Sequence, residues 1–280
     1  MKKSMIKYIF PVIILTLLLS VLADTAIAQI KEPEVIEKSD PKTPLSEGYH
    51  NALGFDLVIN NFGFGIGGTY GRAVAPYTEI TFRTGITGIR DASEQNFQSF
   101  LTGQQIVPNK YKRAFGFPFL LGVKQRLFAR HIQDNMRVFV SAAGGPALAF
   151  TYPYVSDTPV PGRGEPNGFR DFQVGPNGFL FPVERINDFF TGWSEGESKW
   201  GYSGAIKIGV DLGSEFKSRT TIEFGYFFYY FNEGLQIMEP YKPTEYNADG
   251  EPVFESRVKF FDAQKYFGTP QIKFTFGGMW

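Results

Sequence analysis

The last ten residues, Gln271 to Trp280, read QIKFTFGGMW. Their large apolar side chains, Ile272, Phe274, Phe276 and Trp280, all fall on one parity of the chain. Glutamine, lysine and threonine fall on the other parity, which is the period of a β-strand with one apolar and one polar face. A strand buried in a water-soluble core seldom ends a chain on an aromatic residue, whereas Trp concentrates at membrane interfaces. The stretch therefore predicts a terminal strand whose apolar face contacts lipid.

The same alternation recurs in seven earlier segments, in which Phe, Leu, Ile, Val and Tyr fill one parity. Glycine, small polar and charged residues fill the other parity. These segments are 52–60, 62–72, 77–89, 111–128, 136–152, 199–213 and 219–231. Eight alternating segments predict an all-β fold, a transmembrane antiparallel up-and-down β-barrel. We expect a β-bulge at Pro118, because proline cannot donate to the ladder, and an interruption at Gly144-Gly145-Pro146.

The connections between these segments alternate between short and long. The short ones are 73–76, 129–135 and 214–218, and the long ones are 91–110, 153–198 and 232–265. In outer-membrane barrels short turns face the periplasm and long loops face outward, and an even strand count leaves both chain ends in the periplasm. The connection at Asn60-Asn61 is unusually short for an outward one. We expect the aromatic residues of 153–198 to pack on one another or to grip a partner.

The N-terminus has the order of a secretory signal peptide over residues 1–28. Three lysines precede an apolar run from Ile9 to Ala23, and Ala26-Ile27-Ala28 forms a small-x-small cleavage site. The run is shorter than the roughly 20 residues of a transmembrane helix, so a cleaved signal is favoured over an uncleaved anchor. Residues 29–50 are polar and carry three prolines, which predicts a flexible periplasmic segment. The barrel is then expected to occupy residues 51–280.

The signal sequence, the alternation, the unequal loops and the aromatic last strand together resemble the family of small, eight-stranded, porin-like outer-membrane β-barrel proteins of Gram-negative bacteria. The resemblance implies a location in the cell outer membrane and contact with outer-membrane lipid and lipopolysaccharide. It also implies insertion by the outer-membrane assembly machinery, which reads the last strand. Phe274, Phe276 and Trp280 match that assembly signal, although Gly277-Gly278 is less aromatic than the usual pattern. Members of the family serve as structural proteins, adhesins, narrow channels or lipid-modifying enzymes.

A water-soluble lipocalin-like barrel is the main structural alternative, since it also has eight antiparallel strands. Its apolar face points inward and its polar face outward. In this chain the charges share one parity with the glycines and small polar residues, and the opposite parity is almost wholly Phe, Leu, Ile, Val and Tyr. Exposing that apolar parity to water would leave a continuous apolar band far larger than soluble monomers tolerate. Lipid around the barrel and a polar lumen satisfy both parities.

The polar parity then predicts a lumen charge network of four acids and six bases. Its members are Asp56, Glu79, Arg83, Lys124, Arg126, Arg137, Lys207, Asp211, Glu223 and Lys273. They should pair, because an isolated buried charge is costly. Strand neighbours suggest Glu79 with Lys124 or Arg126, and Lys273 with Asp56 or Glu223. An eight-stranded barrel is just wide enough for side chains to fill, so we expect a plugged lumen.

The amino-acid composition offers few of the side chains that catalysis commonly uses. Cysteine is absent and His50 and His131 are the only imidazoles, both on the expected periplasmic side. We expect no enzyme activity, cofactor or metal site. The near-neutral charge gives no case for nucleic acid. The expected function is a structural or surface-interaction role through the long outward loops, with no extracellular partner identified. The alternatives are a narrow channel or uptake protein for a small or apolar solute, and a soluble lipocalin-like binding protein.

Overall fold

The computed structural model describes residues 40–98, 105–132, 134–154, 171–174, 180–183, 189–244 and 257–280. The chain divides into two compact units, Met1–Asp40 and Pro41–Trp280, and the second contains the barrel. The predicted signal peptide and residues 29–39 lie outside the described residues, so the cleavage site stays a prediction.

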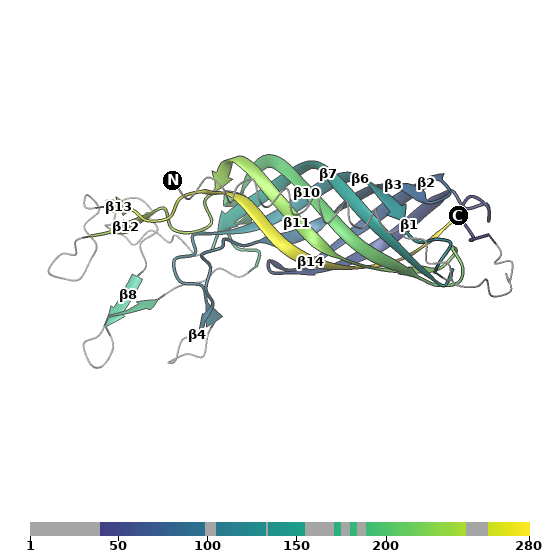
Figure 1. Cartoon of the computed structure of the whole chain (residues 1–280). Helices are drawn as coiled ribbons and strands as arrows, with labels where there is room; N and C mark the ends of the chain where they lie inside the picture. The colour runs from purple at the N-terminus through teal and green to yellow at the C-terminus, as the bar shows by residue number, and fades with distance from the viewer. Residues whose placement is uncertain are drawn as a thin grey trace, which may run out of the picture. The chain divides into compact units, whose positions relative to one another are not determined.

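Eight antiparallel strands close into a barrel, which confirms the predicted fold (Figure 1). Each strand pairs with its neighbours in the up-and-down order expected from the sequence. The barrel strands are β1 (Asn51–Asn60), β2 (Gly63–Ala75), β3 (Thr78–Ile89), β6 (Lys112–Arg126), β7 (Met136–Pro153), β10 (Glu197–Leu212), β11 (Arg219–Leu235) and β14 (Gln264–Met279). No helix among the described residues is long and apolar enough to cross a membrane.

Each of the three long connections contains a small two-stranded hairpin. The hairpins are β4 (Phe97–Gln98) with β5 (Gln105–Ile106), β8 (Asp171–Val174) with β9 (Leu180–Val183), and β12 (Tyr241–Pro243) with β13 (Arg257–Lys259). A short 3₁₀ turn, η1 (Trp193–Glu195), precedes β10. The short turns lie at the opposite end of the barrel, which also holds the C-terminus (Figure 1).

Three details of the strands differ from expectation. The predicted bulge at Pro118 was wrong, because the pairing of β6 with β7 keeps one register from Lys112 to Arg126. The predicted interruption at 144–146 was also wrong, since β7 runs through it and pairs with β10 from Met136 to Thr151. β11 continues to Leu235, beyond the predicted 219–231, and Leu235 pairs with Gln264 at the start of the last strand.

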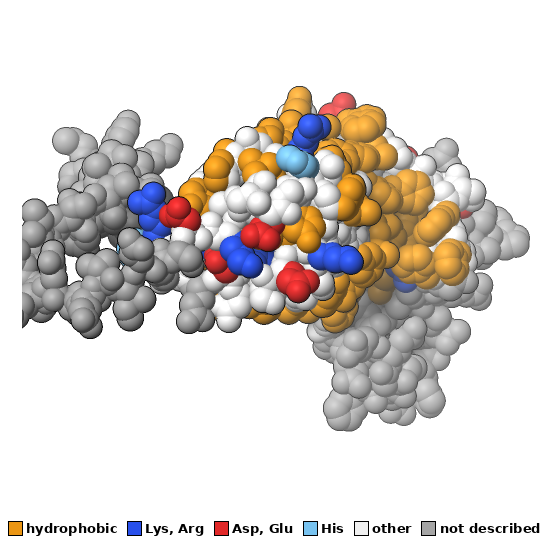
Figure 2. Space-filling view, turned by 90° about the vertical axis from the view of Figure 1, so that its right-hand side faces the viewer, with side chains coloured by type: hydrophobic (Ala, Val, Ile, Leu, Met, Phe, Trp, Pro, Cys, Tyr) orange, Lys and Arg blue, Asp and Glu red, His pale blue; other side chains and the backbone are white. Residues whose placement is uncertain are grey.

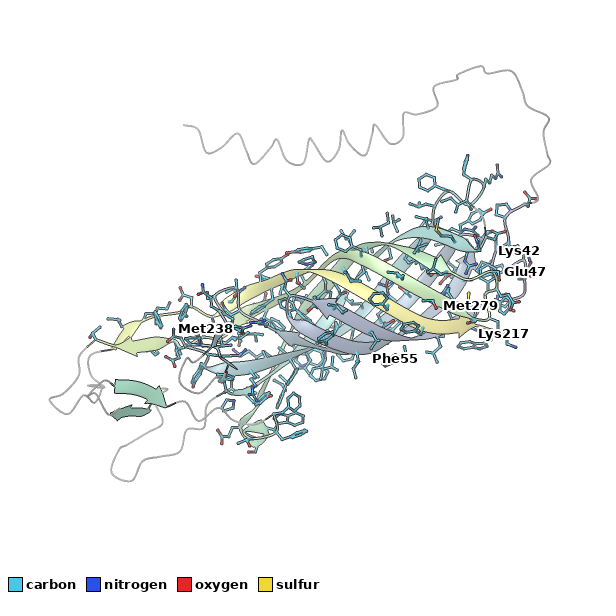
Figure 3. All side chains as sticks on the ribbon, turned by 90° about the horizontal axis from the view of Figure 1, so that it is seen from below. Lys42, Glu47, Phe55, Lys217, Met238 and Met279 are labelled. Carbon is cyan, nitrogen blue, oxygen red and sulfur yellow. The ribbon has the colours of Figure 1, made fainter. Side chains whose placement is uncertain are left out.

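The outer wall of the barrel is apolar, as the parity predicted. Phe64 and Ile206 are 83% and 73% exposed, and Phe55 projects from the wall (Figure 3). Viewed at the end with the short turns, charged side chains gather at the centre and hydrophobic ones cover the flank (Figure 2). A continuous apolar wall of this kind requires an apolar solvent.

A row of exposed tyrosines crosses this wall toward the outward end. Tyr202, Tyr230 and Tyr266 are direct partners across β10, β11 and β14, and the hydroxyl of Tyr266 donates to that of Tyr226 at 3.3 Å. Tyrosine rings with one apolar and one polar end are typical of the membrane interface in barrels. The row therefore has the composition of a membrane-interface girdle.

The aromatic turn before β10 packs against the outward end of the same wall. The Trp193 ring lies 6.0 Å from Phe150 and 6.1 Å from Tyr152, and the Tyr152 hydroxyl donates to the carbonyl of Phe189 at 3.2 Å. Tyr152 has the outward parity expected of it but is fully buried, because this turn covers it. Of the other aromatic side chains singled out in this loop, those of Phe172, Phe179 and Phe181 lie outside the described residues.

Candidate functional site

The lumen is filled by two polar clusters and by a stack of aromatic rings. The polar clusters lie toward the end with the short turns, and the aromatic stack lies toward the end with the long connections. The central cluster is organised by Glu223 on β11, whose side chain is 1% exposed. Its carboxylate accepts hydrogen bonds from Arg83 Nη2 on β3 at 3.0 Å and from Ser141 Oγ on β7 at 3.2 Å, and it forms an ion pair with Lys273 Nζ on β14 at 2.6 Å. These strands lie on different sides of the barrel, so one carboxylate ties its walls together across the lumen.

Asp56 on β1 extends the central cluster. It accepts hydrogen bonds from the hydroxyls of Thr69 and Thr275, each at 2.5 Å, and from Lys273 Nζ at 3.4 Å. Lys273 therefore contacts both Asp56 and Glu223, the two partners that strand neighbourhood suggested for it.

The lower cluster lies nearer the short turns. Lys124 on β6 forms an ion pair with Asp211 on β10 at 2.7 Å, and the Asp211 carboxylate also accepts from Thr221 Oγ1 at 2.5 Å. Arg219 on β11 binds Glu79 at 2.8 Å and lies 3.7 Å from Asp211. The expected pairing of Glu79 with Lys124 or Arg126 is therefore wrong, because Arg219 occupies that place. Arg219 was overlooked as the first residue of its strand, although it shares the parity of Glu223.

Arg126 and Arg137 bind at the rim of the barrel and not inside the lumen network. Arg126 pairs with Asp134 at 2.9 Å and donates to the carbonyl of Lys42 at 2.8 Å. Arg137 donates to the carbonyls of Asp134 and Gly213. Burial alone would raise the pKa of Asp134, but hydrogen bonds from Arg126 and from the Lys42 amide outweigh it and hold that pKa below its usual value.

Lys207 contributes to the central layer without a direct partner. The side chain is buried, yet within the described part of the chain its ammonium makes no ion pair and no hydrogen bond. Glu223, which attracts it electrostatically, is already bound by Arg83 and Lys273. The lumen consequently holds more positive than negative charge.

Residues 41–50 close the barrel at the end with the short turns. Leu45 and Tyr49 pack against a buried cluster that includes Phe216 and Met279, and the amide of His50 donates to the carbonyl of Trp280 at 3.0 Å. Figure 3 shows Glu47 and Met279 at this end and Met238 at the other. The expectation of a segment without fixed contacts therefore fails for this part of 29–50.

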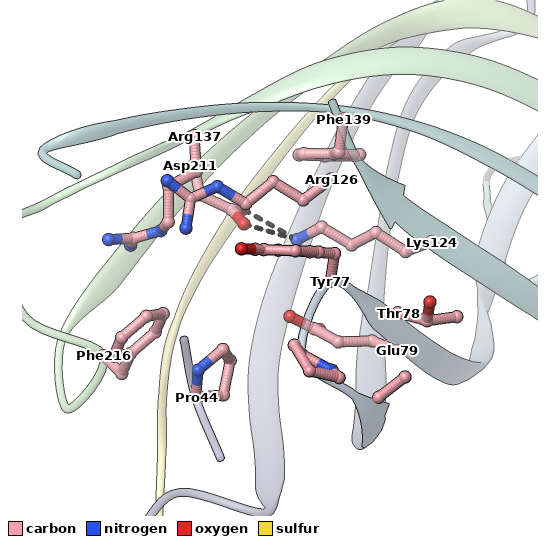
Figure 4. A pocket seen from close by; sticks show the side chains of 12 residues that line it. Pro44, Tyr77, Thr78, Glu79, Lys124, Arg126, Arg137, Phe139, Asp211 and Phe216 are labelled. Atoms are coloured by element: carbon pink, nitrogen blue, oxygen red, sulfur yellow. Dashed lines mark hydrogen bonds and ion pairs between the residues drawn. The ribbon is translucent and has the colours of Figure 1, made fainter. Parts of the chain in front are cut away.

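We call residues 41–50 the floor of the barrel. Between this floor and the lower cluster lies a cavity of about 20 Å³, which has room for a single water molecule. Its lining includes Pro44 and Phe216 together with Glu79, Lys124 and Arg137 (Figure 4). The cavity is too small to admit a solute.

The outward half of the lumen is filled by aromatic rings. Phe227, Tyr229 and Phe231 project inward at alternate positions of β11, with ring centroids 4.7 and 6.0 Å apart. Tyr229 reaches across the barrel, where its hydroxyl lies 3.1 Å from Thr87 Oγ1 and its ring fills the space beside Gly116. These rings share the parity of Glu223, but the polar residues that mark the inward face do not reveal them.

The chain after β11 then crosses the mouth of the barrel. The carbonyl of Ile237 accepts from the amides of Tyr111 and Lys112, and the amide of Glu239 donates to the carbonyl of Asn109. Ile237 and its neighbour Met238 are buried there. This crossing pairs with the start of β6, three strands away in the barrel order, and covers the aromatic stack.

The remaining sequence-predicted residues lie away from these clusters. Phe276 and Trp280 are exposed on the outer wall of β14, and Phe274 is half-buried on the same parity, so their role as an assembly signal stays a prediction. His50 precedes β1 and His131 lies in the turn after β6. Among the described residues, no group of His, Asp and Glu side chains is arranged to hold a metal ion.

No protein-family model and no curated protein sequence matches this chain. Among solved structures, the chain is similar to the N-terminal β-barrel domain of Pseudomonas aeruginosa OprF, with 9% identity and a TM-score of 0.31 over 81% of this chain and 99% of that one. It is also similar to Acinetobacter baumannii CarO2, with 12% identity and a TM-score of 0.25 over 82% of this chain and 98% of that one. Similarity at this level assigns no function, so the argument for function depends on the geometry.

Proposed function

We propose that this chain is an integral outer-membrane β-barrel that serves as a structural or surface-interaction protein through its outward loops. The observation that carries the proposal is the filling of the lumen. A packed floor, two ion-pair clusters, an aromatic stack and a crossing segment follow one another along the barrel axis. With the interior occupied, the outward hairpins are the part of the protein left to meet a partner.

The membrane location is supported by the direction of the two faces. A soluble lipocalin-like protein would need a polar outer wall, whereas here large apolar side chains are exposed and the charges are inside. The alternation of short and long connections supports an orientation with the short turns in the periplasm.

A narrow channel is the second candidate, favoured by the surplus of basic groups in the lumen. A path for a solute would have to pass Arg83, Lys207 and Lys273, and then the Tyr229 ring. All four side chains are buried, and the first three surround Glu223. Conduction would therefore require the ion pairs and the aromatic stack to rearrange together.

Reconstitution in planar bilayers tests the proposal. Folded protein from detergent is expected to insert without stepwise conductance in monovalent salt, while a known porin in the same bilayer conducts. Reproducible conductance steps from the folded protein would favour the channel instead.

A second experiment tests the surface role. Replacing residues 241–259 by a short Gly-Ser linker should leave the barrel folded, because β12 and β13 pair with each other and not with the barrel. We expect cells with the trimmed protein to lose attachment to host or abiotic surfaces that wild-type cells retain. Unchanged attachment across all surfaces tested would argue against a role for this hairpin.

A further inference from the structure

A hollow opens at the outward end between β11 and the base of the β12–β13 hairpin. It has a volume of about 520 Å³, within the range of small-molecule sites. We call it the outward hollow and define it by six of its lining residues. They are Glu233, Gln236, Tyr241, Lys259, Phe261 and Asp262.

The backbone around the outward hollow is held in place before any ligand arrives. The register of β11 against β14 shifts between Tyr230 and Leu235, where Gly234 adopts a φ of 75° beside Ala263. This bulge separates the two strands and lets the hairpin turn away. Gln236 Nε2 then donates to the carbonyls of Met238 and Phe261, at 2.6 and 3.2 Å, and fixes the base of the hairpin.

The side chains of the hollow combine an aromatic surface with charges of both signs. Tyr241 is 53% exposed and lies in the β12–β13 hairpin, which extends beyond the end of the barrel (Figure 1). Carboxylates are supplied by Glu233, which lies 3.8 Å from Lys199, and by Asp262, which pairs with Lys259; a further ammonium group comes from Lys265, which also lines the hollow. The charges balance, so the lining does not select a polyanion or a polycation.

We propose that the outward hollow binds a pyranose sugar, such as a unit of a cell-surface or environmental glycan. A pyranose ring has an apolar C–H face that stacks on an aromatic side chain and a rim of hydroxyls that both donate and accept hydrogen bonds. Tyr241 and Phe261 supply the aromatic surface. The carboxylates accept from sugar hydroxyls and the lysines donate to them. This inference rests on the proposed surface role and names the chemistry of the partner.

The test is a titration of the folded full-length mature protein in a sugar-free amine-oxide detergent. The probes are methyl glycosides of glucose, galactose and mannose, together with N-acetylglucosamine and rhamnose, followed by saturation-transfer NMR. At least one pyranoside should bind saturably in the millimolar range. Tyr241→Ala should weaken that binding at least tenfold, and Glu233→Gln should weaken it severalfold.

Trp193→Ala is the matched control, because Trp193 is a similarly exposed aromatic residue that lies in the turn before β10 and not in the hollow. It should bind the same pyranoside as wild type does. Heat-shifted mobility on a gel checks that each variant is folded. Absence of saturable binding by every pyranoside, or equal binding by wild type and Tyr241→Ala, would overturn the inference. Binding confined to phosphate or sulfate would overturn it as well.

These outcomes are separable from those of the proposed function. If no sugar binds but the trimmed hairpin still abolishes attachment, the sugar site fails and the surface role stands. If wild-type protein conducts in bilayers, the proposed function fails whatever the sugar titration shows.

Discussion

Glu223 is the residue on which the central ion-pair cluster depends. Glu223→Gln keeps the shape of the side chain but leaves Arg83 and Lys273 buried without their shared counter-charge. Breaking a buried pair by removing one partner costs about 3–5 kcal/mol. We therefore expect this variant to unfold at a clearly lower urea concentration than wild type in lipid vesicles, as followed by tryptophan fluorescence.

Glu197→Gln is the matched control for Glu223→Gln. Glu197 pairs with Lys112 at 2.9 Å, but its side chain is 59% exposed. Exposed pairs contribute about 0–1 kcal/mol, so its urea midpoint should stay close to that of wild type. Equal losses in the two variants would contradict the assignment of Glu223 to a buried network.

At the scale of single residues, strand parity predicted which charges face inward but not how they pair. Period two leaves no freedom in the face that a residue occupies. Partners depend on register across several strands and on side-chain length, so Arg219 could reach Glu79 and displace the expected Lys124. The sequence also could not predict that Lys207 makes no ion pair within the described part of the chain. That result depends on Arg83 and Lys273 binding Glu223 in its place.

The contact of β6 with β11 across the lumen gives a prediction at the scale of elements. A Cβ on Gly116 would lie 2.5 Å from the Tyr229 ring, which has no room to withdraw. Overpacking of this kind typically costs about 1–3 kcal/mol. Gly116→Ala should therefore lower the urea midpoint, again followed by tryptophan fluorescence.

Gly144→Ala on β7 is the control for this prediction. The nearest atom to a Cβ there is the carbonyl oxygen of Ser203 at 3.7 Å, an ordinary contact. Its urea midpoint should match wild type within error. If Gly116→Ala were as stable as Gly144→Ala, the aromatic stack could not fill the lumen as described.

The docked segment 41–50 should respond to pH through Asp134. The pKa of this carboxyl lies below its usual value of 3.8. The stability that the Asp134 carboxylate gives to the docked segment is therefore fully present above pH 3.8 and is lost as the pH falls through the folded pKa. The chain has no cysteine, so a nitroxide on Glu47→Cys reports the segment alone. Its electron paramagnetic resonance spectrum should show a more mobile label below pH 3.8, and Asp134→Asn should mobilise it at neutral pH.

A nitroxide on Glu215→Cys, in the turn between β10 and β11, is the control, because no hydrogen bond or ion pair joins that side chain to Asp134 among the described residues. Its mobility should not change in Asp134→Asn. If the mobility of the label on Glu47→Cys changed neither with pH nor in Asp134→Asn, Asp134 would not be what keeps residues 41–50 docked.

The strands could be predicted where they contact lipid, because lipid imposes the alternating pattern. Their extensions outside the lipid-contacting region were harder to predict. Inside the membrane every second residue must be apolar, so the strand count and the faces followed from the sequence. The end of β11 over residues 232–235, beyond the predicted 219–231, includes a glycine and lacks that regular pattern. Its strand character comes from the pairing of Leu235 with Gln264 on β14, a tertiary effect that no local pattern reveals. The hollow beside Gly234 arises from the same extension.

The orientation of the whole molecule can be tested by labelling intact cells. Lys259 lies in β13, at the end of the barrel with the long connections (Figure 1), and Lys217 lies in a short turn at the other end (Figure 3). A membrane-impermeant maleimide should label Lys259→Cys on intact cells. It should label Lys217→Cys only after the outer membrane is permeabilised. The reverse pattern would mean that the barrel is inverted.

The central claim is that this chain forms a closed barrel with its apolar wall in lipid. The most direct measurement is the mobility of the mature protein, extracted from an outer-membrane fraction with detergent, on a gel with and without boiling. We predict that unboiled protein runs at a shifted position, because the closed ladder of β-strand hydrogen bonds resists the detergent until it is heated. Recovery of the protein in the soluble periplasm, with no shift on boiling, would contradict the lipid-facing wall.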